Sequence, residues 1–157
     1  MLIFAHRGVS GHFPENTLMA FQAALDAQCQ AIELDVYALQ NQLVVIHDRQ
    51  LARTTNGEGN LEDHTLESLS ALDAGRGESV PTLWQVMQLV ANKVVLNIEL
   101  KGADTAELLI ALLAKAQQEL KLDLSTIVVS SFNHRLLQQL RKLRPTLALG
   151  VLIAHRP

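Results

Sequence analysis

The chain has 157 residues and a mass of 17.3 kDa, enough for one domain with a buried hydrophobic core. Hydrophobic residues make up 48% of it and charged residues 18%, a composition that argues against disorder. The formal net charge of -3, with no block of five like charges, gives no reason to expect a nucleic acid partner or a charged interaction tail. The longest apolar runs are far shorter than the roughly 20 residues of a membrane span.

Cysteine usage and the first residues bear on the cellular compartment. A single cysteine, Cys29, excludes an internal disulfide framework and a zinc site built from several cysteines. The first residues lack the basic segment and the long apolar segment of a signal peptide. We therefore expect a soluble protein of a reducing compartment, the cytoplasm.

Short apolar runs alternate with longer helical patterns along the chain. The predicted strands are residues 2–5, 31–36, 43–46, 93–99, 126–130 and 147–153, and the predicted helices are 17–29, a segment after Pro81, 104–120 and 134–143. Asn16 is the expected N-cap of the first helix, and Thr82 with Gln85 forms a capping box before the second. Strands that alternate with helices indicate a largely parallel sheet with helical crossovers.

The link between the second and third predicted strands departs from this pattern. About six residues separate them, whereas a parallel crossover normally takes a dozen or more. A hairpin through Gln40 and Asn41 would set Asp35 roughly opposite Ile46. A parallel arrangement with a short return that contains no helix is the open alternative.

Polar side chains gather at the ends of apolar strands, where folding does not demand them. The residues concerned are His6, Arg7, Glu33, Asp35, His47, Asp48, Glu99, Lys101, Ser130 and Ser131. Glu33 and Asp35 are two positions apart, and therefore on the same face of a strand. In parallel α/β folds, ligands bind outside the carboxyl ends of the strands, so these side chains converge where a site is expected.

The charge types in this set match one chemistry. Three carboxylates suit a hard divalent cation, which prefers oxygen ligands. Arg7 suits a phosphate as a bidentate fork, and Lys101 as a point charge. His6 and His47 suit proton transfer near neutral pH. A metal, a phosphate clamp and an acid/base pair together describe the hydrolysis of a phosphate ester.

Each of these residues also has a purely structural interpretation. Glu33 and Asp35 fit the wet face of an amphipathic strand, and Glu99 with Lys101 fits a surface ion pair. The remaining histidines lie away from the strand ends and are interpreted as surface or loop residues: His12, His64, His134 and His155. The site would be absent only if every one of these residues had a purely structural role. We consider that combination less plausible than a functional site.

Seven short sequence blocks carry a family resemblance. They are His6-Arg7-Gly8, Pro14-Glu15-Asn16-Thr17, Glu33-Leu34-Asp35-Val36, His47-Asp48, Arg53-Thr54-Thr55, Val80-Pro81-Thr82-Leu83 and Glu99-Leu100-Lys101. In this order they resemble the glycerophosphodiester phosphodiesterases, which are TIM-barrel enzymes of the phosphatidylinositol-phospholipase-C-like group. The resemblance covers residues 4 to about 132. One block alone would be weak evidence, whereas seven ordered blocks are specific.

The resemblance implies a function and a role for each matching residue. The family reaction is a metal-dependent hydrolysis of glycerophosphodiesters to sn-glycerol 3-phosphate and an alcohol, with Mg²⁺ or Ca²⁺ as the expected cation and a small molecule as the partner. Carried over by position, Glu33, Asp35 and Glu99 become metal ligands, His6 and His47 the catalytic acid/base pair, and Arg7 and Lys101 the phosphate contacts.

The length of the chain qualifies this expectation. A (β/α)8 barrel typically needs about 250 residues. We therefore expect one domain, residues 1–157, that forms an incomplete TIM barrel with about six of its eight strands and lacks the last two βα units. Open edges at the first and last strands favour marginal stability or self-association.

Two other functions stay in view at this stage. One is a related phospholipase-D-like enzyme that forms cyclic phosphates, against which the lone cysteine and the missing signal peptide count. The other is a catalytically inactive truncated fragment.

Overall fold

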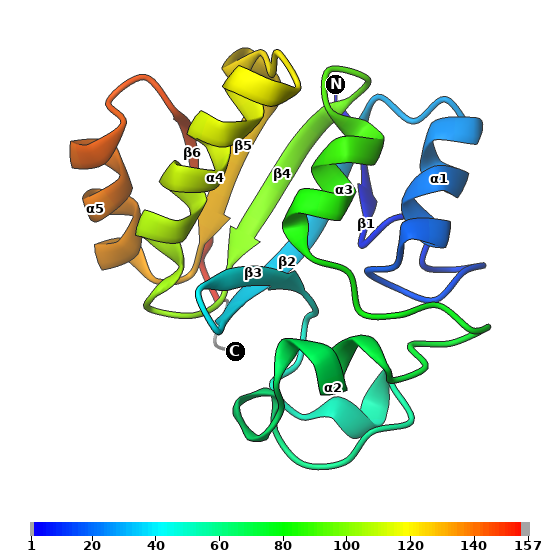
Figure 1. Cartoon of the computed structure of the whole chain (residues 1–157). Coiled ribbons are helices and arrows are strands. Elements are labelled where there is room, and N and C mark those ends of the chain that lie inside the picture. Colours follow the sequence, from blue (N-terminus) through cyan, green and yellow to red (C-terminus); the bar gives the residue numbers. More distant parts are fainter. Residues whose placement is uncertain (1, 155–157) are drawn as a thin grey trace.

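A six-stranded sheet organises residues 2–154, which are the residues that the computed structural model describes (Figure 1). Its strands are β1 (Phe4–His6), β2 (Ala31–Leu39), β3 (Gln42–Val45), β4 (Val95–Leu100), β5 (Ile127–Ser131) and β6 (Ala148–Val151). The strands β1-β2-β4-β5-β6 are parallel in that order, and β3 pairs with β2 antiparallel, off this path. The α/β class and the six strands are as predicted, and the arrangement is that of a partial barrel.

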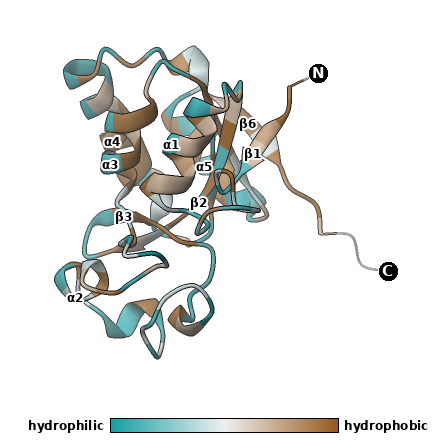
Figure 2. Cartoon of the chain, turned by 90° about the vertical axis from the view of Figure 1, so that its right-hand side faces the viewer, coloured by the Kyte–Doolittle hydropathy of each residue, from teal (hydrophilic) through white to brown (hydrophobic). Residues whose placement is uncertain are grey.

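Four helices cover one side of the sheet, as Figure 2 shows in a view turned by 90°. They are α1 (Leu18–Asp26), α3 (Leu83–Val90), α4 (Thr105–Glu119) and α5 (His134–Leu143). The main hydrophobic core lies between these helices and the strands, where Ile32 and Leu34 of β2 pack with side chains such as Phe21 of α1. Because side chains alternate along a strand, Glu33 and Asp35 point to the opposite face.

The connection between β2 and β3 is the hairpin, so the parallel alternative is excluded. Val36 pairs with Val45, and the amide of Ile46 donates to the carbonyl of Asp35 at 3.0 Å. Gln40 and Asn41 both have positive φ, at 47° and 61°. That is the backbone of a two-residue turn whose twist matches that of the flanking strands.

The helix starts agree with the sequence in part. Thr82 forms the predicted capping box with Gln85. The N-cap of α1 is Thr17, whose hydroxyl accepts from the amide of Ala20, so the prediction that Asn16 caps this helix is wrong. Asn16 has a φ of 57°, outside the extended conformation that an N-cap residue adopts, and its side chain points elsewhere.

The stretch between β3 and α3 has little sequence periodicity because it consists of short turns. It contains α2 (Leu66–Ser70) and two 3-10 helices, η1 (Leu51–Arg53) and η2 (Leu61–Asp63). Leu51, Leu61 and Leu69 are fully buried in a second, smaller hydrophobic cluster. In Figure 1 this segment lies at the bottom of the molecule, beyond the carboxyl ends of β2 and β4.

β1 and β6 form the two ends of the strand order in the described part of the chain. Apolar side chains at these strands face solvent: Ile3, just before β1, is 70% exposed, and Val151, the last residue of β6, is 60% exposed. None of the helices described is both long and apolar enough to cross a membrane. The surface interpretation of His155 concerns a residue outside the described range.

Candidate active site

Three buried carboxylates meet at the carboxyl edge of the sheet. Glu33 and Asp35 come from β2 and Glu99 from β4, and one oxygen of each lies within 4.8 Å of the others. The strand register explains the meeting, because Asp35 is directly opposite Glu99 and Glu33 shares the face of Asp35. The three residues are between 1% and 8% exposed. The interpretation of Glu33 and Asp35 as a wet strand face therefore does not hold.

The charges in this acidic cluster repel one another. Burial, and then the negative charge of Asp35, raise the pKa of Glu33 to about 7. The backbone amide of Arg7 acts in the opposite direction, since it donates to Glu33 Oε2 at 3.2 Å. A cation among the three carboxylates would relieve the repulsion.

Two basic side chains compensate the cluster in part. Lys101 Nζ lies 2.7 Å from Glu99 Oε1 and 3.2 Å from Asp35 Oδ1, and Arg7 Nε lies 3.2 Å from Asp35 Oδ2. The buried oxygens Asp35 Oδ1 and Glu99 Oε1 meet Lys101 at ion-pair distance but without hydrogen-bond geometry. Two accepting oxygens thus have no hydrogen-bond donor among the described residues, and the residues present fit a divalent cation that prefers oxygen ligands.

Asn16 holds one of these carboxylates. Its Nδ2 donates to Asp35 Oδ2 at 3.1 Å, and the residue is almost fully buried. The sequence interpretation missed this contact because a helix followed directly and an N-cap was the simpler role. The available signal was the place of Asn16 in Pro14–Thr17, one of the blocks that carry the family resemblance.

The turn after β1 places Arg7 beside the acidic cluster. Arg7 and Gly8 have φ values of 56° and 80°, and the amide of Arg7 also donates to the carbonyl of Glu33 at 2.9 Å. A Cβ on Gly8 would lie 2.7 Å from the carbonyl carbon of Ala20 in α1. Glycine is therefore required there by both its φ and the close approach of the helix.

The two candidate catalytic histidines lie in different surroundings. His6 Nε2 is 3.6 Å from Glu33 Oε2, with its side chain 64% exposed. His47 Nδ1 is 2.5 Å from Asp48 Oδ1. His47, together with Tyr37 and Lys101, lines an open hollow of about 520 Å³. We predict that the two rings lie on two sides of a bound phosphodiester.

Glu15 and Arg53 are further charged residues near the acidic cluster that sequence reasoning left without a role. Glu15 accepts from both Arg7 and Arg53. Burial alone would raise the pKa of Glu15, but the hydrogen bond from Arg53 and the two positive charges outweigh it and leave that pKa lowered. Their blocks in the sequence, Pro14–Thr17 and Arg53–Thr55, were the available signal.

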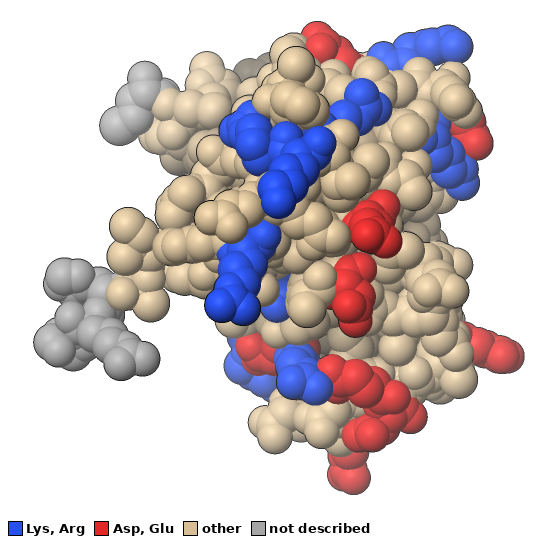
Figure 3. Space-filling model, turned by 90° about the vertical axis from the view of Figure 1, so that its left-hand side faces the viewer, with Lys and Arg blue, Asp and Glu red and all other residues tan. Residues whose placement is uncertain are grey.

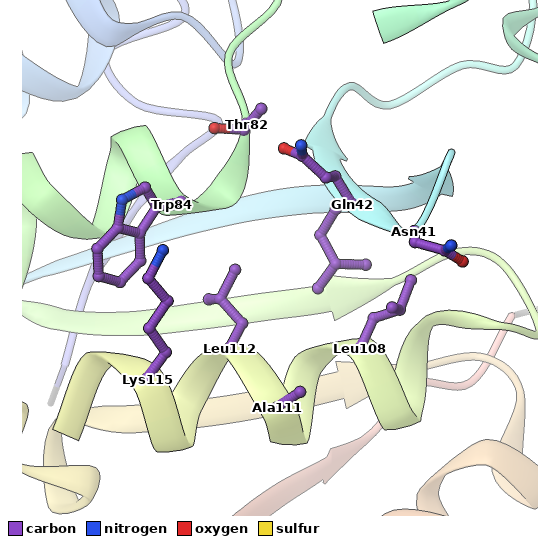
Figure 4. Close-up of a pocket in the computed structure, with 9 residues that line it drawn as sticks. Asn41, Gln42, Thr82, Trp84, Leu108, Ala111, Leu112 and Lys115 are labelled. Carbon is purple, nitrogen blue, oxygen red and sulfur yellow. The ribbon is translucent and has the colours of Figure 1, made fainter. Parts of the chain in front are cut away.

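A second hollow, of about 400 Å³, lies among α3, α4 and the tip of the hairpin (Figure 4). Leu108 and Leu112 line it from α4, and Lys115 Nζ lies 4.0 Å from the centre of the Trp84 ring. Trp84 is half-buried at this rim and packs against the main hydrophobic core. The lining residues include no acid or histidine, so this hollow lacks the groups of the carboxyl edge.

Lys and Arg side chains gather on the face of the molecule seen in Figure 3. The helix α5 contributes Arg135, Arg141 and Lys142, with Arg144 as its C-cap residue. Arg141 donates to the carbonyls of Pro145 and Leu147, and Arg144 to Gln117. Part of this charge therefore serves the C-terminal end of α5, where positive charge is favourable.

The fold and the site first define a class: an α/β protein of the TIM-barrel type with an acidic cluster at the carboxyl edge of its parallel strands. Within that class, the model of the glycerophosphoryl diester phosphodiesterase family matches residues 6–157. The chain belongs to this family, as the seven sequence blocks predicted.

Individual relatives support the assignment. A glycerophosphodiester phosphodiesterase of Caldanaerobacter subterraneus subsp. tengcongensis is 42% identical, over 96% of this chain and 66% of its own length. One from Bacillus altitudinis is 39% identical, over 99% of this chain and 69% of its own length. The chain thus spans about two thirds of the length of these two relatives.

Solved structures show the same architecture. A phosphodiesterase of Oleispira antarctica, in complex with the product sn-glycerol-3-phosphate, superposes with a TM-score of 0.86 at 31% identity, covering 100% of this chain and 68% of that one. A glycerophosphodiester phosphodiesterase of Agrobacterium tumefaciens superposes with a TM-score of 0.80 at 33% identity, covering 95% of this chain and 65% of that one.

Proposed function

We propose that this protein hydrolyses glycerophosphodiesters to sn-glycerol 3-phosphate and an alcohol, as a phosphoric diester hydrolase. The observation that carries the proposal is the buried acidic cluster of Glu33, Asp35 and Glu99, with Arg7 and Lys101 against it. The family assignment and the product-bound Oleispira antarctica relative point to the same substrate class. Residues 1–157 are proposed to form a single phosphodiesterase domain.

The proposal assigns Glu33, Asp35 and Glu99 as the ligands of one divalent cation, Mg²⁺ or Ca²⁺. A bound cation would supply Lewis-acid stabilisation of the negative charge that develops on the phosphoryl oxygens. The chemistry of the donor set supports the assignment, since carboxylate oxygens are what both ions prefer. The raised pKa of Glu33 indicates that its carboxylate gains from a cation more than a solvated carboxylate would.

Arg7 and Lys101 are assigned to the phosphate. Arg7 is 17% exposed in its side chain and Lys101 is 15% exposed, so each faces the site from a partly desolvated position. Their donors compensate the acidic cluster, and positive charge beside the proposed cation site would also attract an anionic phosphodiester. Fixed donors of this kind stabilise the transition state without reorganising.

His6 and His47 are assigned to proton transfer, with His6 as base and His47 as acid. The base takes the proton of the nucleophile, which is water or the glycerol hydroxyl of the substrate itself. The nucleophile's oxygen then bonds to phosphorus, the bond from phosphorus to the alcohol oxygen breaks, and the acid gives that oxygen a proton. Where the nucleophile is the glycerol hydroxyl, the product of this step is a cyclic phosphate, and attack of water with cleavage of one ring P–O bond then gives sn-glycerol 3-phosphate. The open hollow beside His47 is the proposed place for the departing alcohol.

One competing proposal rests on a specific observation. β1 and β6 end the strand order of the described residues with apolar side chains in solvent. The competing proposal is that the chain is a catalytically inactive fragment, which keeps the acidic cluster but does not turn over substrate. The same edges support the proposal that the 157-residue chain associates with a second copy, which size-exclusion chromatography across a concentration series tests.

Turnover of glycerophosphocholine by the purified chain tests the proposed function. Release of sn-glycerol 3-phosphate is expected with Mg²⁺ or Ca²⁺, and its loss is expected with a chelator. Glu33→Gln serves as the inactive control. Cation binding without turnover would favour the competing proposal, and a cyclic phosphate as the final product would favour the phospholipase-D-like reaction.

The cytoplasm is the proposed compartment. The half-buried free thiol of Cys29 supports a reducing environment. Fractionation of cells that produce the protein, followed by detection in each fraction, tests this assignment.

A further inference from the structure

Arg53 lies at the centre of a line of alternating charges in the loops beside the acidic cluster. Its Nη2 and Nη1 donate to Glu15 Oε1 and Oε2 at 2.7 and 3.0 Å, so the pair is bidentate. Its Nε donates to Asp48 Oδ2. The other oxygen of Asp48 lies 2.5 Å from His47 Nδ1. Arg53 is thus one carboxylate away from a candidate catalytic histidine.

The opposite end of the line reaches the acidic cluster. Glu15 Oε1 also accepts from Arg7 Nη1 at 3.0 Å, and Arg7 Nε lies 3.2 Å from Asp35 Oδ2. Through Glu15, Arg53 is therefore also one carboxylate away from the candidate phosphate contact Arg7.

The geometry calls for arginine at this position. A guanidinium has a rigid fork of donors that can satisfy two carboxylates at once, whereas an ammonium is a single point charge. The backbone of Arg53 is also anchored, because it ends the 3-10 helix η1 that begins at the fully buried Leu51. The amide and hydroxyl of Thr55 both donate to the carbonyl of Leu51, at 3.0 and 2.8 Å.

Stability alone does not account for this arrangement. The side chain of Arg53 is 48% exposed and that of Asp48 is 27% exposed, and ion pairs this open contribute little to the free energy of unfolding. These contacts can instead fix the orientation of the side chains at the two ends of the line. The hydrogen bond from Arg53, more than any other contact, lowers the pKa of Asp48 to about 2. Asp48 is therefore an anion that only accepts hydrogen bonds. It can fix the His47 ring through the proton on Nδ1 and so turn Nε2, the nitrogen that would give up a proton in the proposed reaction, away from Asp48.

We propose that Arg53 is a positioning residue that orients His47 through Asp48 and Arg7 through Glu15, and so couples the proton-transfer group to the phosphate-binding group. The inference rests on the proposed function for what His47 and Arg7 do, but the orientation itself can be measured without substrate. The two sequence blocks that carry Glu15 and Arg53 thereby gain a physical role.

Steady-state kinetics on glycerophosphocholine provide the first test. For Arg53→Ala, kcat is expected to fall by about 10- to 100-fold and KM to rise, the usual scale for losing a group that orients a ligand. For Arg53→Lys, only part of this loss is restored, because the ammonium can pair with one carboxylate. Asp48→Asn is expected to change mainly kcat, and Glu15→Gln mainly KM. Arg144→Lys, whose donor to Gln117 is on the far helix α5, is the matched control and keeps both parameters.

Nitrogen NMR of the His47 ring provides a second test that needs no turnover. Wild type is expected to keep a proton on Nδ1 throughout a pH titration, whereas Arg53→Ala should show a mixture of Nδ1 and Nε2 tautomers at high pH, with Tm changed little. Unchanged kcat, KM and ring shifts in Arg53→Ala would overturn the inference. If wild type shows no phosphodiesterase activity, the proposed function fails, and the ring shifts of the two Arg53 variants alone decide the inference.

Discussion

The two halves of the candidate site are held in place in different ways. Glu33, Asp35 and Glu99 stand on adjacent central strands, are buried, and owe their meeting to strand register. His47 and Arg53 stand on an irregular segment, are 30% and 48% exposed in their side chains, and owe their positions to charged hydrogen bonds. Pairing of the strand backbones is enough to bring the three carboxylates together. The positions of His47 and Arg53 depend instead on individual side-chain contacts.

The buried half is expected to show the largest effect on activity. Glu33→Gln removes a proposed ligand and should lower turnover by about 10³-fold or more, since loss of Lewis-acid stabilisation costs several kcal/mol. The fold should persist, because the neutral amide relieves repulsion from Asp35. Assays at saturating Mg²⁺ and circular dichroism measure both quantities.

Glu119→Gln, on the exposed side of α4, is the matched control for this change and should keep full activity. Normal turnover in Glu33→Gln would exclude the acidic cluster from the reaction.

Substitution of the histidines is expected to have the next largest effect. It compares the two halves of the site, because His6 lies beside the acidic cluster and His47 belongs to the irregular segment. His6→Ala and His47→Ala should each lower kcat by about 10²-fold or more, the scale for losing one acid/base group. His12→Ala and His64→Ala should leave kcat unchanged. Either candidate that retains near-normal kcat has no part in proton transfer.

Substitution of Asn16 tests how much the orientation of Asp35 contributes to cation affinity. Asn16→Gly keeps the positive φ and removes the hydrogen bond to Asp35, and cation affinity should fall by about 10- to 100-fold in calorimetric titration. Asn92→Gly is the matched control, with a φ of 61° and a hydrogen bond to the distant Lys121. Equal cation affinities in the two variants would show that Asn16 does not orient Asp35.

The smallest expected effect is a pH dependence of stability. Because the pKa of Glu33 is raised from 4.5 to about 7, the folded chain binds more protons than the unfolded chain between these values. The free energy of unfolding of the cation-free protein should therefore fall as pH rises from about 4.5 to about 7. A Tm lower by several degrees is expected at the upper end, and Mg²⁺ should restore it above pH 7.

Glu33→Gln should remove this part of the pH dependence, so the comparison of its melting curve with that of wild type isolates the contribution of Glu33. Identical pH profiles for the two proteins would show that Glu33 titrates at its ordinary value in the fold.

The helices and strands could be predicted because each has a local signal. The period of apolar residues predicts β2 and β4, and the spacing of Thr82 and Gln85 predicts the start of α3. The hairpin stayed open between two arrangements, since a link of six residues excludes a helix but does not choose the strand direction. The N-cap of α1 was misplaced by one residue because Asn16 and Thr17 both suit that position.

The sequence by itself determined the family, the α/β class and the three carboxylates, because alternation within a strand puts Glu33 and Asp35 on one face whatever the rest of the chain does. Only the tertiary structure decided which loops reach them. Glu15 and Arg53 are 38 positions apart and meet because the hairpin, η1 and the turn before α1 converge beyond the carboxyl ends of the strands. Contacts between irregular segments depend on the path of the whole chain, so no local period or spacing in the sequence encodes them.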